Sequence, residues 1–147
     1  MDVNITPLIK EVLDKGYLMS LATVDTYGVW VADVIYICDD DMNIYWMSDP
    51  SVRHSQAIHK NGNVAGTITV SVQGEDNLGI QFCGIAKKII GTRYDLARTY
   101  FIKKKKPIPQ EYDDVLQGDS WYILTPQTIE LIHETLFGFD KQKLELT

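Results

Sequence analysis

Hydrophobic residues recur with a helical period at the start of this chain. The apolar side chains of segment 6–15 fall on one face of a helix: Leu8, Ile9, Val12 and Leu13. Thr6 offers a capping hydroxyl, Pro7 suits the first helical position, and Gly16 follows the last apolar residue. The pattern therefore predicts a short amphipathic helix that begins at Thr6 and ends before Gly16.

From Tyr17 onward, the pattern favours β-strands. Apolar and β-branched residues gather in short segments separated by turn residues: 17–24, 29–37, 44–48, 63–72, 78–90, 121–126 and 128–134. The last two segments are separated by a predicted turn at Thr125-Pro126-Gln127, and Gly84 predicts a bulge or a barrel corner. Many short strands favour a closed or nearly closed antiparallel barrel, because closure removes unpaired edges.

Two further helices are expected between the strands. Segment 51–62 carries an apolar stripe and ends at Asn61-Gly62. Segment 93–105 follows Thr92, which together with Asp95 resembles a capping box, and it ends before Pro107. Both helices are short, so the chain remains mainly β.

Composition places the chain among ordinary globular domains. Its 147 residues are 45% hydrophobic and 23% charged, which predicts one domain over residues 1–147. A net charge of −6 argues against a nucleic-acid partner, so an anionic ligand needs a local basic site. The start of the chain lacks a secretory pattern, and no apolar run is long enough to cross a membrane, which predicts a cytoplasmic protein. Cys38 and Cys83 fit no metal or redox spacing and are expected as reduced thiols in or near the core.

The segment SDPSVRH, residues 48–54, carries the clearest candidate chemistry. It joins a predicted strand to a predicted helix, where backbone N–H groups are free to bind an anion. Arg53 can bind a phosphate through two N–H groups, and His54 and Ser48 can each donate further hydrogen bonds. The segment thus predicts a phosphate pocket; the alternative is a surface Arg and His on a solvated helix.

Other candidate sites have less support. His54, His59 and His133 show no metal-ligand spacing, so no metal site is expected. The chain has neither the G-x-S-x-G pattern of a serine nucleophile nor a glycine-rich phosphate loop. The sequence therefore contains no motif that indicates acyl transfer or nucleotide phosphoryl transfer.

Several motifs in order resemble a known superfamily. GVWVADVIYICDDDMNIYWMSDPSVRHSQAIHKNGNVAGTI, followed by LGIQFCGIAKKI, resembles the pyridoxamine 5'-phosphate oxidase-like, FMN-binding split barrels. More narrowly, VRHSQ, GIQFCG, DLAR and TLFGFDK resemble the YhbP-like branch of that superfamily. The resemblance implies a six-stranded antiparallel split β-barrel with short flanking helices. It also implies an intertwined homodimer with two FMN sites at the subunit interface.

The resemblance further implies which residues bind the cofactor. Arg53 and His54 hold the flavin phosphate at the start of the helix after the third strand, and Ser48 assists. The backbone at Val34 and Ile35 runs along the isoalloxazine ring. The full set of implied cofactor-binding residues is Val34, Ile35, Met47, Ser48, Arg53, His54 and Gln81.

The chain departs from the superfamily pattern at two places. The broader family commonly has Arg-Lys where this chain has Arg53-His54, and a neutral histidine gives the phosphate less charge. No arginine or histidine follows His133, which argues against vitamin B6 oxidation.

The sequence leaves the function open among several classes. The leading hypothesis is an FMN-dependent oxidoreductase with an unidentified small-molecule substrate. The alternatives are a deazaflavin in place of FMN, a flavin or haem carrier with His54 or His133 as the iron ligand, or a barrel without a ligand. Trp30, Trp46 and Trp121 are expected in the core or the dimer interface, or, for one of them, against the flavin.

Overall fold

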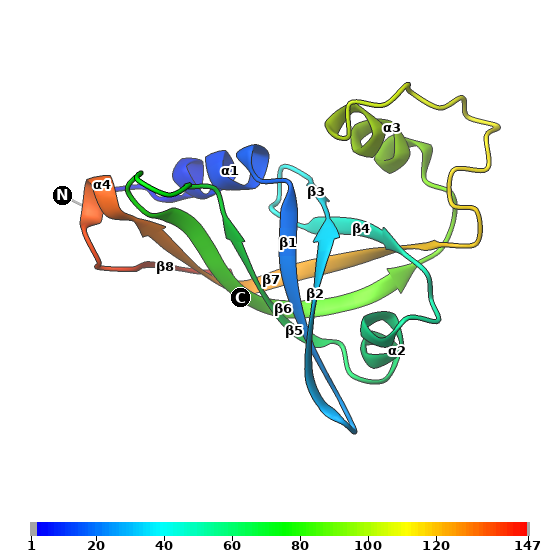
Figure 1. Cartoon of the computed structure of the whole chain (residues 1–147), viewed down its shortest axis with the longest axis horizontal. Coiled ribbons are helices and arrows are strands. Elements are labelled where there is room, and N and C mark those ends of the chain that lie inside the picture. Colours follow the sequence, from blue (N-terminus) through cyan, green and yellow to red (C-terminus); the bar gives the residue numbers. More distant parts are fainter. Residues whose placement is uncertain (1–2, 147) are drawn as a thin grey trace.

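Eight strands form one antiparallel sheet that curls around a hydrophobic core (Figure 1), in a computed structural model that describes residues 3–146. The strands are β1 (Leu18–Asp25), β2 (Gly28–Ile35), β3 (Ile37–Cys38), β4 (Ile44–Ser48), β5 (Asn63–Thr69), β6 (Leu78–Ile89), β7 (Ser120–His133) and β8 (Gln142–Glu145). The helices are α1 (Thr6–Lys15), α2 (Arg53–Lys60), α3 (Tyr94–Lys103) and α4 (Glu134–Phe137). The predicted mainly-β class is confirmed.

The sheet has the order β2-β1-β5-β6-β7-β4-β3, and β8 pairs with β7. Its two edge strands, β2 and β3, are consecutive in the chain and are joined by one residue, Tyr36. Tyr36 is fully buried, and its hydroxyl donates a hydrogen bond to the Leu13 carbonyl at 2.7 Å. The barrel is therefore split along a seam that begins at Tyr36, and from there β2 and β4 diverge (Figure 1).

The strand count exceeds the expected six by two short strands, β3 and β8. Segments 121–126 and 128–134 are one continuous strand, so the predicted turn at Pro126 is wrong. Cys83 pairs with Thr128 and Gly84 with Pro126, which leaves Gln127 unpaired in a bulge. A Cβ on Gly84 would overlap the Thr125 carbonyl, so glycine is what allows β7 to bend there. The predicted bulge at Gly84 is confirmed.

Two hydrophobic clusters lie on opposite faces of β4 and β7. The first fills the curl of the sheet and includes Ile9 and Leu13 of α1 and Ile58 of α2. The second lies under α3 and consists of Ile37, Tyr45, Leu96, Ala97, Tyr100 and Trp121. Trp46 and Trp121 are fully buried, as expected for core residues, whereas Trp30 is 45% exposed.

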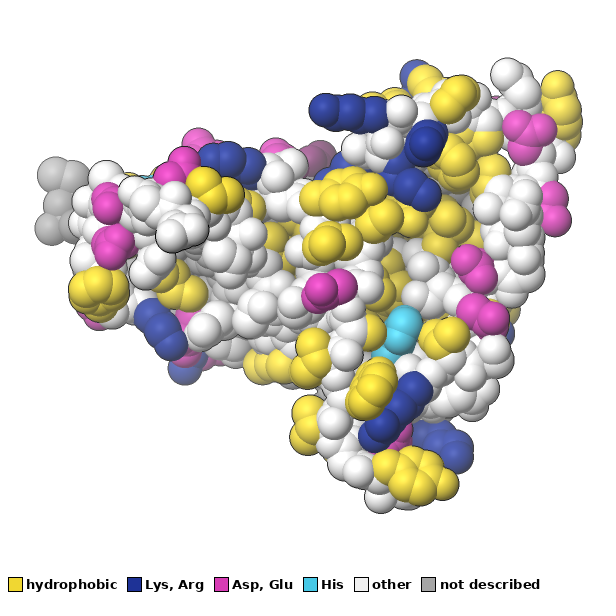
Figure 2. Space-filling view, in the orientation of Figure 1, with side chains coloured by type: hydrophobic (Ala, Val, Ile, Leu, Met, Phe, Trp, Pro, Cys, Tyr) yellow, Lys and Arg dark blue, Asp and Glu magenta, His cyan; other side chains and the backbone are white. Residues whose placement is uncertain are grey.

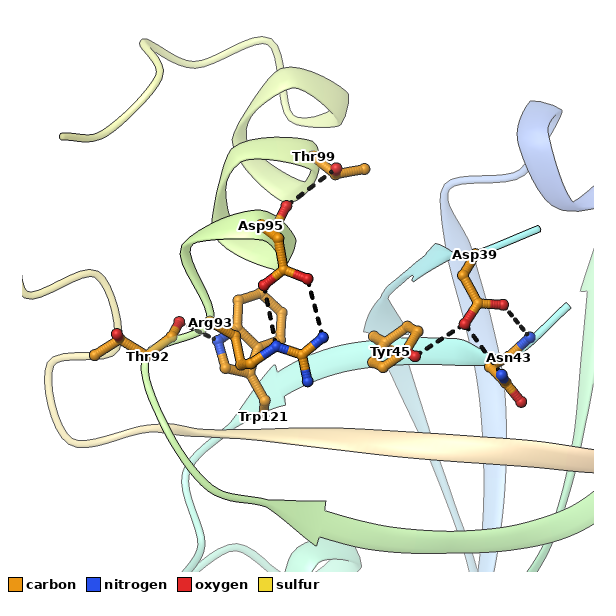
Figure 3. A network of polar contacts seen from close by, with 8 residues as sticks. All are labelled: Asp39, Asn43, Tyr45, Thr92, Arg93, Asp95, Thr99 and Trp121. Atoms are coloured by element: carbon orange, nitrogen blue, oxygen red, sulfur yellow. Dashed lines mark hydrogen bonds and ion pairs between the residues drawn. The ribbon is translucent and has the colours of Figure 1, made fainter. Parts of the chain in front are cut away.

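Trp121 joins α3 to the barrel. Its indole N–H donates to the Thr92 carbonyl at 2.8 Å (Figure 3). Its ring meets Tyr100 edge-on with centroids 5.7 Å apart. The expected capping box at Thr92 and Asp95 is wrong, because Asp95 instead accepts two hydrogen bonds from the Arg93 guanidinium. The predicted cap at Thr6 is also wrong: Ile5 occupies the N-cap position, and no side chain caps α1 there.

The two cysteines lie in different environments. Cys38 is half-buried, and burial and the nearby Asp14 raise the pKa of its thiol to about 11. Cys83 is exposed on the outer face of β6, so its expected place in or near the core is wrong. Neither forms a disulfide. Among residues 3–146, no helix is long and apolar enough to cross a membrane.

Candidate functional site

The end of β4 and the start of α2 bring Ser48 and His54 together. Ser48 Oγ lies 3.0 Å from His54 Nε2, and Ser48 is 9% exposed. Between them, Asp49 accepts hydrogen bonds from the Ser51 backbone N–H and hydroxyl, which fixes the turn. Ser48 and His54 therefore form a polar pair at the junction of β4 and α2.

The first turn of α2 adds backbone donors to this pair. Val52 is the N-cap residue in an extended conformation, and no side chain caps the helix. The N–H groups of the first turn point out of the helix end and carry the positive end of its dipole. An uncapped helix start beside a serine and a histidine is a site suited to an anion.

Arg53 points away from Ser48 and His54. Its Nε and Nη2 donate to the two carboxylate oxygens of Asp25, at 2.9 and 3.2 Å. The guanidinium carbon also lies 4.3 Å from the centre of the Trp30 ring. The expected convergence of Ser48, Arg53 and His54 is thus only partial, because Arg53 is bound to the turn between β1 and β2.

A pocket of about 460 Å³ lies between that turn and α2. It is lined by Val24, Asp25, Thr26, Tyr27, Arg53, Gln56, Ala57, Lys60 and Asn61. The helical residues among these share one face of α2, since they are spaced by three or four positions. Figure 2 shows cationic and apolar side chains gathered at this corner of the molecule, with a histidine exposed between them and β4.

Val34, Ile35 and Met47 surround the seam on different sides. Val34 packs into the first hydrophobic cluster, whereas Ile35 and Met47 pack against the second. Successive residues of a strand point to opposite faces, so the β2 backbone at residues 34–35 separates the two clusters. The backbone is therefore the part of this segment that borders the open seam.

Gln81 lies far from Ser48 in the same chain. Both residues are paired with β7, Gln81 opposite Glu130 and Ser48 opposite Ser120. Ten positions along a strand span roughly 30 Å. Gln81 is exposed on the outer face, where it accepts a hydrogen bond from Lys141 Nζ at 3.1 Å. Gln81 cannot complete the Ser48 site within one chain.

The histidines occupy three separate environments. His59 Nε2 lies 2.9 Å from the Tyr122 hydroxyl, and the two rings stack with centroids 5.8 Å apart. His133 ends β7, so it lies at the opposite end of that strand from the Ser48 region. His54 and His133 therefore lie far apart within a single chain. Within the described part of the chain, no three His, Cys, Asp or Glu side chains group as metal ligands.

Sequence reasoning missed Asp25 and Trp30. Asp25 lies in the turn between two strands, 28 residues before Arg53 in the sequence. The hydrogen bond from Arg53 lowers the pKa of Asp25, so this carboxylate is charged at neutral pH. The ion pair between Asp25 and Arg53 could have been expected from one signal in the sequence. Asp25 is an acidic residue in the turn of a predicted hairpin, and such a turn can fold back onto a neighbouring helix.

The pKa of His54 predicts that the stability of the protein depends on pH. Burial lowers its pKa below the ordinary value of 6.5, so the unfolded chain binds the proton more readily than the folded chain. The free energy of unfolding should therefore fall as the pH drops below about 6.5. Urea unfolding at pH 7.5 and pH 5 measures the loss, which should be smaller in His54→Gln. His133→Gln, at the far end of β7, is the matched control. Between pH 7.5 and pH 5, it should lose as much free energy of unfolding as the wild type, because it retains His54. An equal loss in wild type and His54→Gln would contradict the prediction.

No family model matches the chain. Two curated proteins are similar to the chain in sequence. A UPF0306 protein of Photorhabdus laumondii is 27% identical over 99 residues, which cover 66% of this chain and 69% of the relative. The UPF0306 protein YhbP of Salmonella schwarzengrund is 28% identical over 116 residues, which cover 78% of this chain and 74% of the relative.

Solved structures share the fold at low sequence identity. General stress protein 26 from Bacillus anthracis superposes with a TM-score of 0.72 at 18% identity, covering 98% of this chain and 100% of that one. A candidate pyridoxamine 5'-phosphate oxidase from Listeria innocua has a TM-score of 0.69 at 12% identity, covering 88% and 98%. A haem-binding protein from Mycobacterium smegmatis has a TM-score of 0.73 at 14% identity, covering 99% of this chain and 59% of that one.

The curled sheet with its seam has the split-barrel fold of these solved structures, one of which is a candidate pyridoxamine 5'-phosphate oxidase. In sequence, the chain is similar to the UPF0306 proteins, including YhbP, at 27% and 28% identity. The resemblance stated from the sequence motifs is confirmed.

Proposed function

We propose that this protein binds FMN as a homodimer and uses it as an oxidoreductase. The observation that carries the proposal is the uncapped start of α2 beside the Ser48–His54 pair. We place the flavin phosphate there and the isoalloxazine ring in the seam between β2 and β4. The similarity to a candidate pyridoxamine 5'-phosphate oxidase supports the choice of cofactor.

The residues at this position fit a phosphate group. Backbone N–H groups of α2, the Ser48 hydroxyl and a ring N–H of His54 can each donate to a phosphate oxygen. Val34 and Ile35 would border the ring through their backbone, and Met47 would supply an apolar wall. Bound flavin supplies hydride transfer; the side chains bind, orient and exclude water.

A second copy of the chain is part of this proposal. The outer face of β1 and β2 exposes Leu18, Val29 and Val31, at 48%, 73% and 58%. Clustered exposed apolar side chains of this kind are typical of a protein interface. The outer face also carries Gln81, which a dimer could bring to the seam of the second copy.

Titration with FMN, followed by quenching of flavin fluorescence, tests the proposal. We expect saturation at about one FMN per chain, because each copy supplies one α2 start. Ser48→Ala and His54→Ala should each weaken FMN binding about tenfold, the effect of losing one hydrogen bond to a charged group.

Two controls define the outcome. His133→Ala should leave FMN affinity unchanged, since His133 lies at the far end of β7. Riboflavin, which lacks the phosphate, should bind more weakly and should not respond to Ser48→Ala. A folded protein that binds no FMN, or that is purified red with haem, would overturn the proposal.

A further inference from the structure

The turn between β1 and β2 places a carboxylate on the guanidinium nearest the start of α2. Asp25 Oδ2 accepts from Arg53 Nε and Asp25 Oδ1 from Nη2, so two of the five N–H groups are occupied. Asp25 Oδ1 also accepts from the Tyr27 backbone N–H at 2.8 Å, which holds the carboxylate in place. The guanidinium carbon of Arg53 also lies over the face of the Trp30 ring.

A carboxylate and a phosphate bind a guanidinium in the same forked geometry. Arg53 is the first residue of α2, and side chains of a helix lean toward its N-terminus. A change of the Arg53 rotamer away from Asp25 would turn the guanidinium toward an anion at the helix start. The pair is partly exposed, with side-chain exposures of 35% for Arg53 and 17% for Asp25, so an anion from solvent can approach it.

We propose that Asp25 competes with the cofactor's phosphate for Arg53 and so sets how strongly the protein prefers FMN to riboflavin. This inference rests on the proposed FMN site. When phosphate binds, Arg53 exchanges the Asp25 carboxylate for phosphate oxygens and can remain stacked on Trp30. Without a phosphate the ion pair stays intact, so riboflavin gains nothing from Arg53.

The pocket beside the ion pair has room for this exchange. It encloses about 460 Å³ between the turn and α2, and it includes both Asp25 and Arg53. Lys60 lines the same pocket and makes no ion pair with any residue in 3–146. A second cation near Asp25 stabilises the carboxylate once Arg53 has left it.

Asp25→Asn is the central test, because it keeps the shape of the side chain and removes its charge. We expect this variant to bind FMN about tenfold more tightly than wild type and riboflavin with unchanged affinity. Arg53→Ala alone should weaken FMN binding, and it should do so more strongly in the Asp25→Asn background.

The double variant separates competition from a general effect of charge. If Asp25 acts through Arg53, Asp25→Asn has no effect on FMN affinity once Arg53 is alanine. Asp41→Asn is the matched charge control, because Asp41 is an exposed residue in the turn between β3 and β4, outside the β1–β2 hairpin. It should leave FMN affinity unchanged.

The outcomes distinguish this inference from the proposed function. Wild-type binding of FMN with no gain in Asp25→Asn overturns the inference and leaves the FMN site standing. An equal gain with and without Arg53 also overturns it. Absence of FMN binding by both wild type and Asp25→Asn, with both folded by circular dichroism, overturns the FMN site itself.

Discussion

Val31→Glu is expected to convert a dimer of this protein into monomers and to weaken FMN binding by about a hundredfold, since an unpaired charge in an interface costs several kcal/mol. Val31 lies on the outer face of β2, in a row with Ala22, Ala65 and Cys83 across four strands. These side chains are small or apolar, so a second copy can approach closely. Sedimentation at micromolar concentration and flavin fluorescence measure the two effects.

Val72→Glu provides the matched control for this experiment. Val72 is 67% exposed but lies in the loop after β5, outside the row. It should leave both the assembly and FMN affinity unchanged. A Val31→Glu protein that stays dimeric would place the interface elsewhere, and a monomer that holds FMN as tightly as wild type would remove the second copy from the site.

Trp121→Ala is expected to lower the free energy of unfolding by about 3–5 kcal/mol, the usual cost of removing a buried tryptophan ring. Trp121 is fully buried and connects the Thr92 carbonyl and Tyr100 to β7. Its loss should also release α3 from the barrel, because this ring lies at the centre of the second cluster. Urea unfolding measures the stability, and hydrogen exchange in α3 measures the release.

Trp121→Phe separates the ring from its hydrogen bond. Phenylalanine keeps much of the packing but cannot donate to Thr92, so we expect a loss nearer 1–2 kcal/mol. Equal losses in the two variants would show that the ring is not what holds α3.

Local patterns predicted the elements well where the structure depends on neighbours in the sequence. Segment 44–48 is β4 with the predicted bounds, because a β-branched and aromatic run is closed by Asp49-Pro50. Pro126 was misleading: proline usually ends a strand, but here it lies in the bulge opposite Gly84. Cys83 was predicted in or near the core, but it is exposed. The alternation of β6 indicates this, because Ile80 and Phe82 point inward and Cys83 therefore points outward.

The site was predictable only in its local part. Ser48 and His54 are six residues apart, so the strand, turn and helix alone bring them together. The contact of Arg53 with Asp25 depends on how the β1–β2 hairpin twists over α2, which no local pattern encodes. The same holds for Gln81, whose distance from Ser48 follows from the pairing of both strands with β7.

The strand order also determines how late in synthesis the protein can fold. β4 and β6 are both neighbours of β7, although β4 leaves the ribosome long before β7 does. Until residues 120–133 emerge, the β3–β4 hairpin has no strand to join it to the rest of the sheet. Such long-range pairing slows folding, and unpaired edges in a nascent chain favour aggregation. The final quarter of the sequence is therefore what turns two separate pieces of sheet into one barrel.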